Sequence, residues 1–76
     1  MNAERRKLIA SLCDKIEELK AEIEAIMEEE QECFDNLPES LKCSERGEQM
    51  ESAIENLEEA ADSMSEAIES LQESIG

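Results

Sequence analysis

The apolar residues of this chain recur at alternating steps of three and four along two long stretches. They are Ile9, Leu12, Ile16, Leu19, Ile23 and Ile26 in the first stretch, and Met50, Ile54, Leu57, Ala61, Met64, Ile68, Leu71 and Ile75 in the second. This spacing is the apolar seam of a coiled coil, whereas the side chains of a strand alternate with a period of two. The pattern therefore predicts an all-α fold with two long helices.

Local signals place the ends of these helices within one domain, residues 1–76. Asn2 is a suitable N-cap for a first helix over about residues 3–34, and Ser44 is one for a second helix over about residues 44–75. Because the helices are equal in length and their connection is compact, we expect an antiparallel helical hairpin.

A polar turn over about residues 35–43 separates the two helices. Pro38 interrupts the helical pattern, because proline lacks a backbone N–H and restricts the residue before it. Asn36 and Glu39 have the spacing of a capping box, which predicts a short helical turn over Leu37–Leu41. Further on, Gly47 costs helix stability, so it suggests a close approach of backbone or ligand.

Symmetry about the turn predicts the register of the hairpin. It pairs Leu12 with Ile68, Leu19 with Ala61, Ile26 with Ile54, and Glu30 with Met50. Glu30 is therefore expected to be partly buried, and we interpret it as a polar residue that specifies register.

Each helix also carries a second apolar row beside its seam. These rows are Cys13, Met27 and Phe34, with Lys20 interrupting, in the first helix, and Ala53, Ala60 and Ala67 in the second. Such wide stripes predict self-association, most simply a homodimer of hairpins that forms a four-helix bundle. The alternatives are a lone hairpin, or a hairpin whose apolar surface another protein covers.

Cysteine and histidine usage excludes several kinds of site. Cys13 and Cys33 occupy apolar helix positions and are predicted to be small core residues. Cys33 and Cys43 flank the turn, so oxidation could join them. Three cysteines without a disulfide framework suit a reducing cytoplasm. Because the chain has no histidine and its cysteines lack ligand spacing, no metal or cofactor is expected.

The charge is strongly acidic, with 22 acidic and 7 basic residues and a formal net charge of −15. No basic residue follows Arg46. Such a surface disfavours direct binding to DNA, RNA or anionic lipid and favours a basic protein partner. No apolar run approaches the ~20 residues that a membrane span requires. Without His, Tyr, Trp or a phosphate-binding glycine loop, the chain is also not expected to be an enzyme.

The segment 34–47 contains most of the side chains that could bind a specific ligand. Phe34 offers a stacking face and Arg46 a planar fork of donors for phosphate or carboxylate. Donors and acceptors come from Asn36, Ser40, Ser44 and the free N–H groups that begin the second helix. Together these groups could hold a nucleotide-like anion. The alternative is a capped turn in which Phe34 plugs the bundle end and Arg46 pairs with a nearby carboxylate.

Dimer geometry bears on this candidate site. In an antiparallel dimer of hairpins, Arg5, Arg6 and Lys7 of one chain approach Arg46 of the other and form a basic pocket. In a parallel dimer, the same basic cluster instead neutralises carboxylates near the end of the neighbouring second helix.

Two strings of residues around the turn cover about a fifth of the chain: Phe34-Asp35-Asn36-Leu37-Pro38-Glu39-Ser40-Leu41, and then Ser44-Glu45-Arg46-Gly47-Glu48 with Met50. They resemble a motif of short acidic proteins from phages and prophages of Gram-positive bacteria. The resemblance implies a small accessory protein in the host cytoplasm, which binds and blocks host machinery such as antiviral defence.

Three hypotheses follow. The first is a non-enzymatic protein that sequesters a small nucleotide immune signal at the hairpin turn, with Phe34 and Arg46 in the pocket. The second is an acidic mimic of nucleic acid that occupies the basic groove of a host nuclease or regulator. The third is a structural or assembly oligomer.

Overall fold

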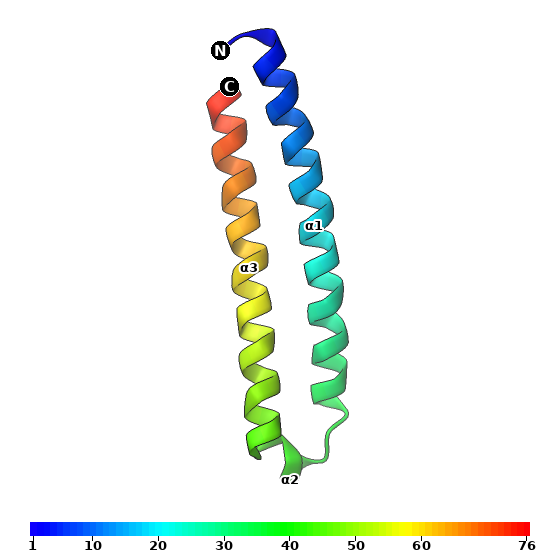
Figure 1. Cartoon of the computed structure of the whole chain (residues 1–76). Coiled ribbons are helices and arrows are strands. Elements are labelled where there is room, and N and C mark those ends of the chain that lie inside the picture. The colour runs from blue at the N-terminus through cyan, green and yellow to red at the C-terminus, as the bar shows by residue number, and fades with distance from the viewer.

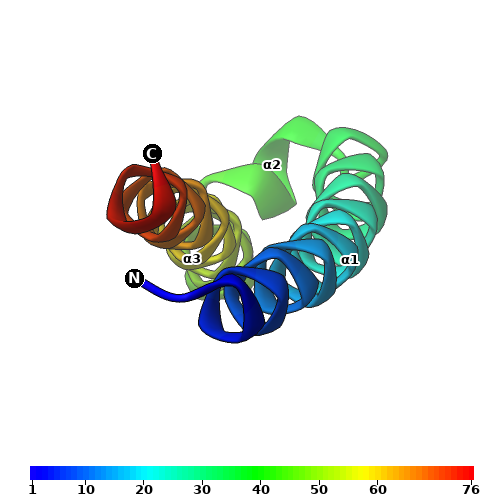
Figure 2. The same ribbon diagram turned by 90° about the horizontal axis from the view of Figure 1, so that it is seen from above.

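Two long helices run antiparallel along a molecule of 58 × 15 × 13 Å (Figure 1). The computed structural model describes residues 1–76, with α1 over Ala3–Asp35, α2 over Glu39–Lys42 and α3 over Glu45–Ile75. The N- and C-termini lie together at one end, and α2 lies at the other (Figures 1 and 2). The predicted all-α hairpin is confirmed, and both long helices begin and end within a residue of the predicted bounds.

Both predicted N-caps are present. The Asn2 side chain accepts a hydrogen bond from the Arg5 backbone N–H at 2.8 Å, and the Ser44 hydroxyl accepts one from the Gly47 N–H at 3.4 Å. Each bond satisfies an N–H group that the first turn of a helix leaves without a partner. The Ser44 hydroxyl also donates to the Leu41 carbonyl, so the same side chain ties α2 to α3.

The predicted capping box in the turn is wrong. Helix α2 begins after Pro38, later than predicted, and no side chain caps it. Asn36 instead ends α1, where its backbone N–H donates to the Glu32 carbonyl at 3.0 Å. Pro38 is the N-cap of α2, and its side chain has no oxygen that could accept a capping bond. The first bonds of α2 run to the Pro38 carbonyl, from the Leu41 N–H at 2.9 Å and from the Lys42 N–H at 3.1 Å.

The seam of α3 is as predicted. All eight of its apolar residues are buried or half-buried, and Ala61 and Ile68 are the deepest, each with 6% of its surface exposed. Helix α3 packs along the length of α1 and also against α2. The apolar heptad of the second helix therefore forms one wall of the core.

The predicted seam of α1 is wrong in half of its positions. Leu12, Leu19 and Ile26 are 46%, 49% and 55% exposed, so they do not pack in the core opposite the α3 residues assigned to them. The buried and half-buried residues of α1 also alternate in steps of four and three, but along a different line. They are Ile9, Cys13, Ile16, Lys20, Ile23, Met27, Glu30 and Phe34.

This difference has a simple geometric cause. Residues seven apart lie nearly above one another on a helix, and α1 has three adjacent rows of mainly apolar residues. The row of Ile16 is in the middle, with the row of Cys13 on one side and the row of Leu19 on the other. One neighbouring helix covers about two rows, so burial of the Cys13 row leaves the Leu19 row in solvent.

The burial of each α1 cysteine also depends on its heptad row. Cys13 is buried, as predicted, whereas Cys33 is exposed because it belongs to the row of Leu12, Leu19 and Ile26. The prediction of a core position for Cys33 is therefore wrong. Cys43 is also exposed, and all three thiols are free.

Candidate functional site

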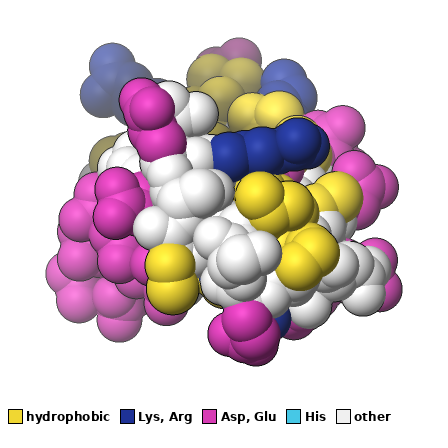
Figure 3. Space-filling model, turned by 90° about the horizontal axis from the view of Figure 1, so that it is seen from below, with side chains coloured by type: hydrophobic (Ala, Val, Ile, Leu, Met, Phe, Trp, Pro, Cys, Tyr) yellow, Lys and Arg dark blue, Asp and Glu magenta, His cyan; other side chains and the backbone are white.

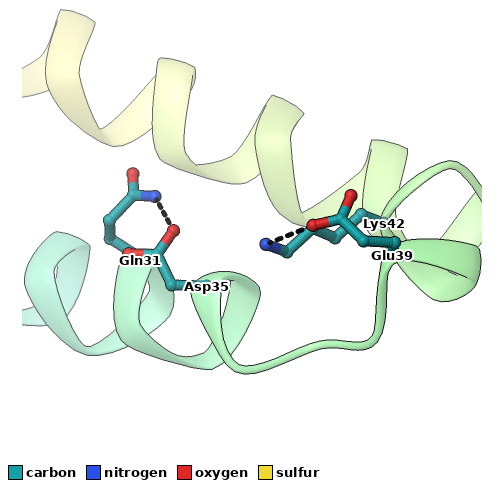
Figure 4. Close-up of polar contacts among 4 residues, drawn as sticks. All are labelled: Gln31, Asp35, Glu39 and Lys42. Atoms are coloured by element: carbon teal, nitrogen blue, oxygen red, sulfur yellow. Dashed lines mark hydrogen bonds and ion pairs between the residues drawn. The ribbon is translucent and has the colours of Figure 1, made fainter.

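Phe34 is half-buried at the turn end of the hairpin, where a cation covers its ring. The Lys42 ammonium lies 5.6 Å from the ring centroid, within the range of a cation–π contact. The same ammonium lies 3.6 Å from a Glu39 carboxylate oxygen (Figure 4). Phe34 lines an open depression together with Gln31, Glu51, Ile54 and Glu55. The ring of Phe34 therefore has Lys42 over it and the side chains of Glu51 and Glu55 in the same depression.

Arg46 lies in a different open depression. This depression is lined by Glu30, Cys33, Arg46, Gln49 and Met50 and shares no residue with the one beside Phe34. It brings Glu30 and Met50 together, as the register predicted, and Glu30 is half-buried. The Lys42–Glu39 contact is the one ion pair of the structure, so the exposed Arg46 guanidinium has no carboxylate partner.

The other candidate residues of the turn have separate roles. The Ser44 hydroxyl is engaged in capping α3 and in its bond to the Leu41 carbonyl. Asn36 and Ser40 are exposed, line neither depression, and make no side-chain hydrogen bond. A nearby side-chain bond, from Gln31 to Asp35 at 3.0 Å, stabilises the last turn of α1 (Figure 4).

Arg5 and Arg6 belong to the beginning of α1, which lies at the terminal end of the molecule and away from the turn (Figure 1). Both are exposed and unpaired. Most of the length of α1 therefore lies between these arginines and Arg46 of the same chain, in a molecule 58 Å long. Within one chain, the structure does not bring the predicted binding residues together: Phe34 and Arg46 line separate depressions, and the N-terminal cations are at the other end.

No family model, curated protein or solved structure matches the chain. No helix is both long and apolar enough to cross a membrane. No group of three or more His, Cys, Asp and Glu side chains is placed to hold a metal ion.

Helix α3 is divided lengthwise into an acidic half and a half without carboxylates. All its acidic side chains are exposed and occupy three adjacent heptad rows: Glu48, Glu55, Asp62 and Glu69; Glu51 and Glu58; and Glu45, Glu59, Glu66 and Glu73. We call these ten residues the acidic face. The other four rows contain Ala, Ser, Asn, Gln, Leu, Met, Ile, Gly47 and the single cation Arg46. Sorting the sequence by heptad row would have shown this division.

The carboxylate-free rows of α3 and the exposed apolar row of α1 lie on the same side of the hairpin. Cys33 from the α1 row lines one depression with Arg46 and Gln49 from the α3 rows, whereas Glu51 and Glu55 line the depression on the other side. We call this surface the neutral face, and its members are Leu12, Leu19, Ile26, Cys33, Ala53, Ala60 and Ala67.

Figure 3 looks onto the turn end of the molecule. The largest group of carboxylates lies at one side of this view, and a patch of apolar side chains lies elsewhere, beside a basic side chain. Smaller groups of carboxylates lie on the other side of this view, so the division into an acidic half and a carboxylate-free half belongs to α3 and not to the whole hairpin.

Proposed function

We propose that this chain is a non-enzymatic, phage-type binding protein that counteracts bacterial antiviral defence by sequestering a small nucleotide signal. Arg46 carries the proposal. It is an exposed guanidinium without a carboxylate partner, and it lies in an open depression at the edge of the neutral face. A guanidinium of this kind presents several N–H donors to a phosphate group.

The proposed binding site requires more than one chain. The Arg46 depression also contains the carboxylate of Glu30, so a single copy offers little net positive charge to an anion. The further cations Arg5 and Arg6 are at the other end of the same molecule. Self-association of hairpins into a four-helix bundle supplies them from a neighbour, and the uncovered neutral face provides the surface for it.

Arg46→Gln is expected to weaken nucleotide binding at least tenfold, because a charge-assisted hydrogen bond contributes about 1.5–3 kcal/mol. Thermal shift and calorimetry against a panel of cyclic and ADP-ribose-type nucleotides measure this. A ligand at 100 times its dissociation constant stabilises the folded parent by about 2.7 kcal/mol. Lys42→Gln is the matched control, since that cation lies over Phe34 and outside the Arg46 depression. Failure of every nucleotide to stabilise the parent would exclude this function.

The acidic face favours a second candidate function, mimicry of nucleic acid. Its carboxylates are exposed, and none takes part in an ion pair. A row of uncompensated negative charge along a long helix is complementary to the basic groove of a nuclease or regulator.

Neutralising one row of the acidic face tests this candidate. The variant that combines Glu48→Gln, Glu55→Gln, Asp62→Asn and Glu69→Gln is expected to lose capture of basic host proteins in a pull-down. The parent should retain this capture at low salt, and its binding should fall steeply as the salt concentration rises. The control removes the same charge from α1, through Glu4, Glu18, Glu28 and Glu32 to Gln. Equal capture by the two variants would argue against mimicry by this face.

A further inference from the structure

The neutral face lacks a partner in the single hairpin, and we propose that a second copy of the chain covers it. In this dimer α1 packs antiparallel against α1 of the other copy, with Leu19 beside the two-fold axis. Each end of the dimer then combines Arg46 of one copy with Arg5 of the other. The nucleotide ligand of this dimer rests on the proposed function, whereas the interface rests on the residues of the hairpin alone.

The hairpin has an incomplete core. Its buried residues are Cys13, Gly47, Ala61 and Ile68, and no large side chain is fully buried. Leu19, by contrast, is 49% exposed in the middle of α1, with apolar neighbours one heptad away on either side. Surface of this kind, bordered by the carboxylate-free rows of α3, is typical of helix faces that pack against further helices.

Charge complementarity identifies the partner as a second copy. The row that borders Leu12, Leu19 and Ile26 on the solvent side consists of Leu8, Lys15, Glu22 and Glu29. The charge of this row changes sign along the helix, from the cation of Lys15 to the carboxylates of Glu22 and Glu29. A two-fold interface joins identical patches, and this patch is complementary to itself when it is reversed. With Leu19 on the axis, Lys15 of each copy lies opposite Ile23 of the other, and thus beside Glu22.

The distribution of charge along the whole hairpin favours the antiparallel orientation of the two copies. If the copies were parallel, their turn ends would lie side by side, and segment 28–48 contains eight acidic residues against two basic ones. The antiparallel orientation instead places each turn end beside the N-terminal segment of the other copy, with Arg5, Arg6 and Lys7. Contact between the two α3 helices adds no repulsion, because their facing rows carry no carboxylate. Small residues such as Ala60 also permit a close approach of helices.

The register places a cation from each copy beside the binding site of the other. An axis at Leu19 sets Leu12 against Ile26 and Arg5 against Cys33. Cys33 lines the Arg46 depression, so Arg5 of the second copy extends that depression. Arg5 and Cys33 are separated by ~40 Å along one helix, so only the second copy can supply this contact.

An engineered disulfide tests the interface. In a background of Cys13→Ala, Cys33→Ser and Cys43→Ser, Leu19→Cys is expected to form a disulfide-linked dimer when oxidised glutathione is added. Ala21→Cys is the matched control, because this exposed residue points away from the neutral face and should cross-link at least tenfold more slowly. The parallel orientation brings residue 19 to residue 60 instead. Cross-linking of the double variant Leu19→Cys and Ala60→Cys, without cross-linking of Leu19→Cys alone, would overturn the antiparallel arrangement.

Sedimentation supplies an independent measurement on the reduced chain. The parent is expected to be dimeric, Leu19→Glu to weaken dimerisation at least a hundredfold, and Ala21→Glu, which adds the same charge elsewhere, to leave it unchanged. A parent that sediments as a monomer at all concentrations would overturn the inference, and so would a dimer unaffected by Leu19→Glu. A dimeric parent chain that binds no nucleotide would refute the ligand and leave the interface intact.

Discussion

Replacing Gly47 with alanine is expected to destabilise the hairpin by about 2 kcal/mol or more, although alanine is the better helix former. A Cβ atom at this position would meet the backbone carbonyls of Lys42 and of Leu41, the latter at 2.6 Å. The Leu41 carbonyl cannot move independently, since it accepts hydrogen bonds from the Ser44 hydroxyl and N–H. Relief of the clash must therefore separate α2 from α3.

Urea unfolding followed by circular dichroism measures this effect. In an isolated helix the same substitution would stabilise by about 1 kcal/mol, so the sign of the change reports the tertiary contact. Gly76→Ala is the matched control, because its Cβ would lie 3.4 Å from the nearest atom, at ordinary contact distance. A Gly47→Ala chain as stable as the parent would show that α2 does not pack closely against α3.

Ile68→Ala is expected to cost about 2–4 kcal/mol, a large share of the stability of a chain this small. Ile68 is 6% exposed and belongs to the seam between α1 and α3, so its truncation leaves a cavity in the hairpin itself. The loss should therefore be similar at every protein concentration.

Ile26→Ala removes comparable apolar volume from the neutral face and is the informative comparison. Ile26 is 55% exposed, so its truncation costs little in a lone hairpin. If a second copy covers the neutral face, the cost should rise with protein concentration as the dimer forms. Thermal unfolding across a hundredfold range of concentration measures both variants. Equal, concentration-independent losses would place Ile26 in the core of the single hairpin and contradict the arrangement described above.

The local features of this fold are predictable from the sequence because they depend on near neighbours. The caps by Asn2 and Ser44 require only a side-chain oxygen two or three residues from a free N–H. The capping box proposed for Asn36 is absent because two near neighbours take over: Asn36 is the C-cap of α1, and Pro38 is the N-cap of α2.

The candidate site was harder to predict, because proximity in sequence did not become proximity in space. Phe34 and Arg46 both belong to the segment around the turn, yet they line depressions on opposite sides of the hairpin. The prediction treated the turn as one surface. The side of the hairpin that a residue occupies depends on its heptad row, and the rows can be assigned only when the packed side of each helix is known.

The sequence by itself determined two helices, their bounds, their caps and the apolar seam of α3, because periodicity and capping are local properties of the chain. The tertiary structure alone decided which side of α1 is buried. Three adjacent apolar rows offer two nearly equivalent ways to pack against one helix, and the difference lies in contacts with α3 that a heptad pattern does not contain. That choice exposes Leu12, Leu19 and Ile26 and thereby creates the neutral face.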